Sequence, residues 1–433
     1  MYIPRALKKQ WNSMHMLLKD KQECIIILMI LVTYLKPFNV SLIPKLNTLY
    51  SIAKIVATIA LLIYIFNNKM TFSKSSKWCL AFLMLWTLSI TFNNNIKSNI
   101  QALMSIFGIL LLFNVMRNKN DGVRVILKCL NYISEVYIIL QLYTIIVNHP
   151  IFADAMISFD KYFLGSDNYS AFILIPLSGF ILTNSYMTNK KIDIKSYIFV
   201  VLGFLCLFIP KAWTGMFAYG VFMLLAVSMK MLNLEKIVTA RNAFIIMIIF
   251  LILVVGFNIQ NYFMGVLGVI GKVGFSAREI IWPKAIVAAM QRPICGYGIL
   301  TENQISSYML YGATHAHNII LEFILDTGIV GSFLAAMWFK EAISVKKYIL
   351  KNKEVLLCLQ YCIVAYLLCS IMDFYIELIY FWILIFLFDS LKLEFKDEDI
   401  GENKLRKIED IKNRVFAWII SKLNKINFKN SIK

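Results

Sequence analysis

Apolar runs long enough to cross a lipid bilayer recur from one end of this sequence to the other, and they limit the fold more than any other feature. A helix needs about 20 residues to span the hydrocarbon core, and only helices or closed barrels satisfy every backbone hydrogen bond there. The runs are continuous and lack the apolar/polar alternation of barrel strands. With 59% hydrophobic and 16% charged residues, the sequence predicts an all-α polytopic integral membrane protein.

The apolar runs predict about twelve transmembrane helices in a single domain over residues 1–390, followed by a tail over residues 391–433. The connection between the ninth and tenth helices, about residues 264–316, is long and polar. The expected spans are Glu23–Val40, Leu46–Phe66, Trp78–Phe92, Ile100–Val115, Val123–Val147, Tyr169–Tyr186, Ile194–Pro210, Trp213–Met231, Ala243–Phe263, His317–Phe339, Val355–Met372 and Phe374–Ser390.

The number of lysines and arginines alternates from loop to loop, and this alternation predicts the orientation. With the basic N-terminus in the cytoplasm, every inner connection carries at least three cations, and no outer one before the long loop carries more than two. Cytoplasmic loops of membrane proteins show this bias. The long loop then lies on the outer side of a plasma membrane. The same bias and the basic tail account for the formal charge of +19, so no nucleic-acid partner is expected.

The tail and the cysteines indicate anchoring and packing rather than chemistry. The tail mixes apolar residues with lysines, which favours a cytoplasmic amphipathic helix lying on an anionic inner leaflet. A thirteenth span is the alternative, although Lys422 and Lys425 interrupt its short apolar run. The eight cysteines include no CxxC pair, so neither a zinc site nor a disulfide framework is predicted.

Ionisable residues are scarce in the predicted helices, which directs attention to the outer face. Lys54, Lys128 and Glu135 fall near expected helix ends, where snorkelling explains them. Asp373 and Glu377 flank a tight outer turn and are interpreted as solvated caps. The long loop gathers four cations on the side where cations are disfavoured. An anion-binding surface is the preferred interpretation, and a merely solvated loop is the alternative.

Two histidines, His315 and His317, lie directly before the tenth expected span. They are two residues apart, unlike the i, i+4 pair of a helical metal site, and the sequence shows no acidic or cysteine group that completes such a site. No metal is therefore predicted. A neutral histidine can accept a proton from a hydroxyl nucleophile. The alternative is that both histidines only cap the helix at the membrane surface.

Four short elements follow one another here: Arg278 four residues before Trp282, PICGYG from Pro293 to Gly298, HNIIL from His317 to Leu321, and GIVG from Gly328 to Gly331. In order and spacing they resemble the O-antigen ligase/polymerase family of polytopic bacterial enzymes that build or attach surface polysaccharide. Ser166 to Tyr169 resembles the start of a middle helix in that family. The family also tends to carry a Ser-Arg pair near Ala212 to Gly215, where this chain has Lys211 as its nearest cation.

The resemblance implies a cofactor-free, metal-independent glycosyltransferase that acts on a sugar linked to polyprenyl diphosphate. It implies that His317 is the general base, with His315 as the second candidate. Arg278 would hold the diphosphate, assisted by Lys211 and Arg292. Attack on the anomeric carbon would invert its configuration.

The functional prediction is a polysaccharide polymerase of the capsule, exopolysaccharide or O-antigen type, which joins lipid-linked repeat units on the outer face of the plasma membrane. The expected partners are the polyprenyl-diphosphate-linked oligosaccharide, membrane lipid and other polysaccharide-export proteins. One alternative is a ligase that transfers the glycan to another acceptor. A second is a flippase or transporter for lipid-linked oligosaccharide, and a third is a non-enzymatic membrane scaffold.

Overall fold

A computed structural model describes residues 21–93, 96–149, 151, 162–229, 236–257, 259, 277–345 and 352–396. All regular structure in these ranges is helical. Seven helices are long and apolar enough to cross a membrane by length and composition, and two shorter apolar helices accompany them. The predicted all-α polytopic class is confirmed, and the expected count of about twelve helices is consistent with this set. Most of the tail over 391–433 lies outside the described residues, as do residues 264–276 of the long loop.

The described helices follow the predicted spans closely. A first helix occupies residues 21–34 and a last one residues 379–396. Between them lie α2 (Phe38–Ser41), α3 (Pro44–Asn67), α4 (Lys74–Phe92), α5 (Ile96–Arg117), α6 (Gly122–Val147), α7 (Asp167–Asn189), α8 (Ile194–Phe208), α9 (Trp213–Ser228), α10 (Ala240–Phe257), α12 (Arg278–Gln291), α13 (Glu302–Tyr308), α14 (Ile319–Ile343) and α15 (Lys353–Cys369).

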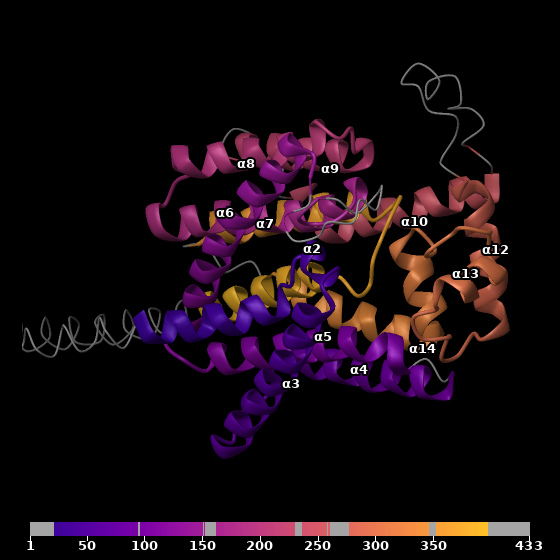
Figure 1. The fold of residues 1–433 in the computed structure, drawn as a ribbon, viewed down its shortest axis with the longest axis horizontal. Coiled ribbons are helices and arrows are strands. Elements are labelled where there is room, and N and C mark those ends of the chain that lie inside the picture. The colour runs from indigo at the N-terminus through magenta and orange to yellow at the C-terminus, as the bar shows by residue number, and fades with distance from the viewer. Residues whose placement is uncertain are drawn as a thin grey trace, which may run out of the picture.

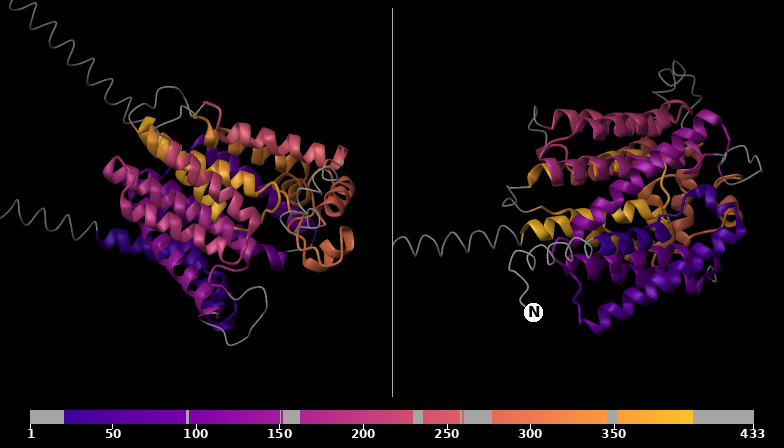
Figure 2. Two further views of the ribbon diagram at one scale, coloured as in Figure 1. Left: turned by 90° about the horizontal axis from the view of Figure 1, so that it is seen from above. Right: turned by 60° about the vertical axis from the view of Figure 1, so that its left-hand side comes forward.

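Most helices lie side by side, while α3 slants away from the others and α12 and α13 gather at one end (Figures 1 and 2). The pairs α4 and α14, α7 and α15, and α6 and α7 pack along one another. Among the seven candidate spans, α7 is the most enclosed, with 83% of its apolar window buried, whereas α3 has only 22% buried. The hydrophobic core therefore surrounds α7 and α15, and α3 presents most of its surface outward.

The connections between helices collect at two opposite ends of the bundle. At one end, which we call the site end, the backbone N–H of Asn39 donates to Phe163 O at 3.2 Å, and Asn318 Nδ2 donates to Ile371 O at 3.0 Å. At the other end, Lys74 pairs with Glu341 at 3.0 Å. The described part of the long connection between α10 and α14, residues 277–318, reaches the site end, where Asn318 lies.

Helix α14 is broken at Gly328, and the loop before α13 fills the break. Gly328 has φ 65° and ψ −171° inside the helix. The N–H of Tyr297 donates to Leu325 O at 2.9 Å, and the N–H of Ile329 donates to Pro293 O at 2.7 Å. Backbone groups freed by the break are therefore satisfied, as the low-dielectric surroundings require. A Cβ on Gly328 would lie 2.3 Å from Ile294 O, which explains why glycine stands there.

Candidate functional site

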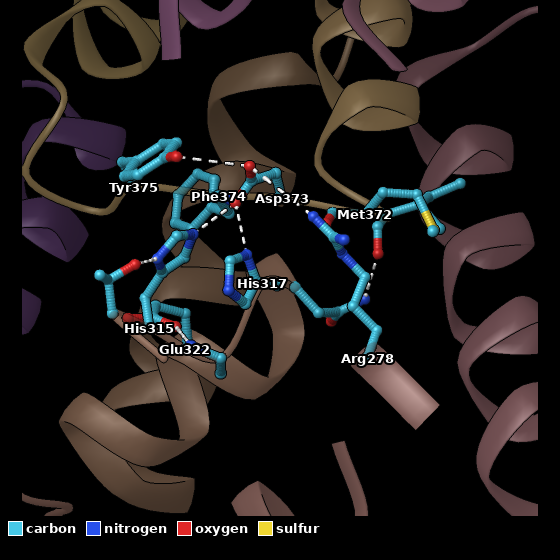
Figure 3. Close-up of polar contacts among 12 residues, drawn as sticks. Arg278, His315, His317, Glu322, Met372, Asp373, Phe374 and Tyr375 are labelled. Carbon is cyan, nitrogen blue, oxygen red and sulfur yellow. Dashed lines mark hydrogen bonds and ion pairs between the residues drawn. The ribbon is translucent and has the colours of Figure 1, made fainter. Parts of the chain in front are cut away.

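Arg278, His315, His317 and Asp373 converge at the site end from three separate segments (Figure 3). Arg278 opens α12, the histidines precede α14, and Asp373 lies in the turn between α15 and the last helix. The sequence brought the arginine and the histidines into one loop. The structure adds a carboxylate that holds them together.

Asp373 is the centre of this cluster. Its Oδ1 accepts hydrogen bonds from His315 Nε2 and, at 3.0 Å, from His317 Nδ1. Its Oδ2 accepts from the Tyr375 hydroxyl at 3.3 Å and lies 3.9 Å from a terminal nitrogen of Arg278. Only 3% of the residue is exposed. The interpretation of Asp373 as a solvated cap is therefore wrong, because neighbouring donors compensate for its burial.

The surroundings of His315 favour its charged imidazolium form. Burial alone would lower its pKa, but the charge of Asp373 and the hydrogen bond to that carboxylate outweigh burial and raise the pKa above the ordinary value. In the charged form Nε2–H donates to Asp373 and Nδ1–H donates to Thr314 Oγ1 at 2.7 Å. The Tyr375 ring packs 4.4 Å from the imidazole. Both ring nitrogens are occupied, so His315 is poorly suited to accept a proton.

His317 has the opposite electrostatic character. Burial lowers its pKa, and the charges of His315 and Arg278 lower it further, against the hydrogen bond to Asp373. Its ring centre lies only 3.9 Å from that of His315, so a second charge there is disfavoured. A neutral His317 that donates Nδ1–H to Asp373 carries its lone pair on Nε2. This nitrogen is a proton acceptor, as the role of general base requires.

Arg278 is fixed by backbone and carboxylate contacts. Its Nε donates to Met372 O, and 8% of the residue is exposed. Helix α12 is seated by the buried side chains of Ile281 and Trp282. A permanently charged guanidinium is therefore held beside His317 by the rigid packing of α12.

Glu322 fixes the backbone that carries the histidines. It lies in the first turn of α14, and its Oε2 accepts the N–H of Ala316 at 2.8 Å. The side chain of Asn318 caps the same helix by accepting from the N–H of Ile320 at 3.0 Å. His317 itself adopts φ 54°, a conformation that needs local support. Sequence analysis did not predict a role for Glu322. An acidic residue in the first turn of the helix that follows His-x-His could have indicated one.

Lys211 and Arg292 lie away from the four central residues. Lys211 is exposed in the turn between α8 and α9 and has φ 62°. Arg292 is exposed, donates to Asn93 Oδ1, and has its guanidinium 5.2 Å from the centre of the Tyr297 ring. In the described part of the chain, neither contacts Arg278 or the histidines. Their expected assistance in diphosphate binding remains a prediction.

The cluster also has the composition of a metal site. Ligand atoms of His315, His317 and Asp373 all lie within 4.8 Å of one another. The prediction of no metal rested partly on the lack of an acidic group, and Asp373 removes that reason. Two other features still oppose a metal. The raised pKa of His315 favours its protonated form, and a metal ligand must be deprotonated. Arg278 also places a positive charge beside Asp373.

The fold and this cluster define a multi-pass helical membrane protein with a buried His–Asp–Arg site at one end of its helices. Residues 198–336 match the family described as O-antigen ligase, which confirms the family resemblance and supports a membrane enzyme of the ligase or polymerase type. No curated protein matches the chain. The matched segment contains Arg278, His315 and His317, whereas Asp373 lies beyond its end.

Proposed function

We propose that this protein is a membrane glycosyltransferase that polymerises polyprenyl-diphosphate-linked oligosaccharide repeat units without a metal or other cofactor. The observation that carries the proposal is the pairing of a neutral His317 with Asp373 beside Arg278. A base, a group that orients it and a fixed cation are the parts that sugar transfer from a diphosphate needs.

In the proposed reaction, an acceptor hydroxyl attacks the anomeric carbon of the donor sugar. The hydroxyl proton passes to Nε2 of His317, and a new C–O bond forms. The bond between the anomeric carbon and the diphosphate oxygen breaks, and the lipid diphosphate leaves with the electron pair. Attack from the face opposite to the leaving group inverts the anomeric configuration. Asp373 stabilises the imidazolium that forms on His317.

Arg278 neutralises charge on the departing diphosphate. A guanidinium is always protonated and matches two phosphate oxygens at once. Its location, 3.9 Å from Asp373 Oδ2, sets the leaving group close to the base. Lys211 and Arg292 would assist only if the substrate extends to the α8–α9 turn or to the Asn93 side of the site end.

The membrane orientation is part of this proposal. The site end would face outward and the N- and C-termini would lie in the cytoplasm of a bacterium, with the basic tail over 391–433 on the inner leaflet. Support comes from the opposite end, where Lys74, Lys119 and Arg124 form ion pairs. The long loop over about 264–316 would then meet lipid-linked substrate after its export.

Polymerase is preferred to ligase because the Lys-, Ile- and Asn-rich composition is typical of AT-rich bacteria that make capsules. A deletion strain separates the two. Loss of a polymerase leaves single repeat units on the lipid carrier, whereas loss of a ligase leaves long chains there. A flippase would instead fail to expose lipid-linked units outside.

The direct test is reconstitution of the full chain with synthetic lipid-diphosphate repeat units. His317→Ala should abolish chain growth, while His149→Ala, which changes an exposed histidine at the end of α6, should not. Equal chain growth with His317→Ala would reject the proposal. So would transport of substrate across the membrane without any joining.

A further inference from the structure

We infer that Lys36 and Lys54 form a second binding site, for the diphosphate of the lipid-linked acceptor. The inference rests on the proposed function and extends it, since a polymerase joins two molecules that each carry a lipid diphosphate. Arg278 would serve the donor, and this pair of lysines would serve the acceptor.

Lys54 lies well inside α3 rather than near its end. At 1.5 Å per residue it is about 15 Å along the helix axis from Pro44, so snorkelling to a helix end does not explain it as the sequence interpretation assumed. It is 9% exposed, although α3 is the least enclosed of the candidate spans. An intramembrane cation that faces the protein is costly and points to a function.

Within the described residues, no carboxylate or other acceptor lies within hydrogen-bond distance of the ammonium group of Lys54. The charge that acts on it is that of another cation, Lys36. Lys36 itself donates to Asn47 Oδ1 at 2.6 Å, and burial lowers its pKa. An anion bound between two partly buried ammonium groups removes their mutual repulsion and offsets the free-energy cost of burying them.

The hydrogen bond from Lys36 to Asn47 brings Lys36 to the face of α3 that carries Lys54. Asn47, Tyr50, Lys54 and Thr58 follow one another at spacings of three or four residues and therefore share a face of the helix. The Thr58 hydroxyl meets that of Tyr34 at 2.8 Å, which fixes this face against the helix over 21–34. The opposite face exposes Ile52, Val56 and Ile63. That face suits lipid, including the chain of a lipid-linked substrate.

A line of aromatic rings joins the segment of Lys36 to the catalytic cluster. The ring of Phe38, two residues after Lys36, lies 5.8 Å from that of Tyr169. The ring of Tyr169 lies 4.9 Å from that of Tyr375, which in turn lies 4.4 Å from His315.

The Tyr380 hydroxyl supplies a second, independent indication of a ligand. It is buried and has no hydrogen-bond partner among the described residues. A buried hydroxyl without a partner costs free energy. A polar ligand that reaches this hydroxyl would satisfy it. An acceptor with its diphosphate at the lysines would extend its sugars past these aromatic rings toward His317.

The test measures binding of sugar-free polyprenyl diphosphate to the full chain in phosphatidylcholine nanodiscs, with Arg278→Ala present to remove the donor site. We expect Lys54→Met, which keeps the length of the side chain, to weaken binding about tenfold or more. Lys54→Arg should retain binding. Lys45→Met is the matched control, because Lys45 is an exposed lysine in the first turn of the same helix.

Competition separates the possible ligands. Inorganic diphosphate should compete weakly and phosphatidylglycerol hardly at all. Unchanged binding by Lys54→Met, or equal competition by phosphatidylglycerol, would overturn the inference. In chain-growth assays, Lys54→Met should raise KM for the single-unit acceptor about tenfold and leave KM for the donor unchanged. If the chain shows no transfer activity, the proposed function fails, and the binding measurement still decides whether the lysines hold a lipid diphosphate.

Discussion

Nδ1 of His317 lies 3.0 Å from Oδ1 of Asp373, the same oxygen that accepts a hydrogen bond from the imidazolium of His315. One carboxylate oxygen thus neutralises one histidine and orients the other. The arrangement shifts the pKa values of two adjacent imidazoles in opposite directions, upward for His315 and, through burial and mutual repulsion, downward for His317. Division of labour between paired titratable groups is a recurring property of acid–base sites.

Asp373→Asn should lower kcat by roughly 100-fold or more while changing substrate KM little. The amide keeps the volume of the carboxylate but no longer fixes the Nδ1–H tautomer or stabilises the imidazolium, and general-base catalysis contributes about 10²–10⁴-fold. Asp121→Asn, an exposed aspartate before α6 at the opposite end, is the control. Full activity of Asp373→Asn in single-turnover assays would show that the carboxylate has no part in the chemistry.

The pH profile of kcat should be bell-shaped. His317 must be neutral to accept a proton, so activity should rise through a pKa below its ordinary value of about 6.5. The charged form of His315 binds Asp373 more strongly than the neutral form and lowers the pKa of His317, so activity should fall as pH rises through a pKa above that value. His315→Gln should remove the alkaline limb and keep the acidic one. An acidic limb centred above about 7 would contradict the assignment of His317.

Arg278→Lys should lower kcat/KM for the donor by about tenfold to 100-fold, and Arg278→Ala should lower it further. Lysine keeps the charge but loses the two-pronged contact with phosphate oxygens. Arg241→Lys changes an exposed arginine at the start of α10 and serves as the control. Equal rates for Arg278 and Arg278→Lys would mean that only a point charge is needed.

Activity should survive chelators, and added Zn²⁺ should inhibit. The ligand atoms of His315, His317 and Asp373 lie within 4.8 Å of one another, so excess zinc would occupy the base and displace its proton. The measurement is chain growth after treatment with a chelator and during zinc titration. Activity that disappears on chelation and returns with a divalent ion would establish metal dependence instead.

Much of the fold and part of the site could be predicted from sequence for clear physical reasons. Membrane-spanning helices can be recognised in a sequence because lipid tolerates only continuous apolar runs. Arg278 and His317 can be recognised as polar residues in a loop beside such runs. Asp373 did not stand out. Its burial depends on the turn after α15 meeting the loop before α14, a contact between segments more than 50 residues apart. Lys54 was interpreted as lying near a helix end although it is ten residues into α3, and sequence alone does not show that the bundle covers its side chain.

Gly328→Ala should destabilise the protein and reduce activity together. The residue has φ 65° and ψ −171°, a backbone conformation that costs other residues about 1–3 kcal/mol. The added Cβ would also lie 2.3 Å from Ile294 O and 2.6 Å from the backbone nitrogen of Cys295. Because this break seats the loop over 293–298, displacement should reach α12 and Arg278. Thermal unfolding in nanodiscs checks the prediction, with Gly220→Ala as control, since a Cβ there meets nothing within 4 Å. A melting temperature for Gly328→Ala equal to that of Gly220→Ala would show that the break does not depend on glycine.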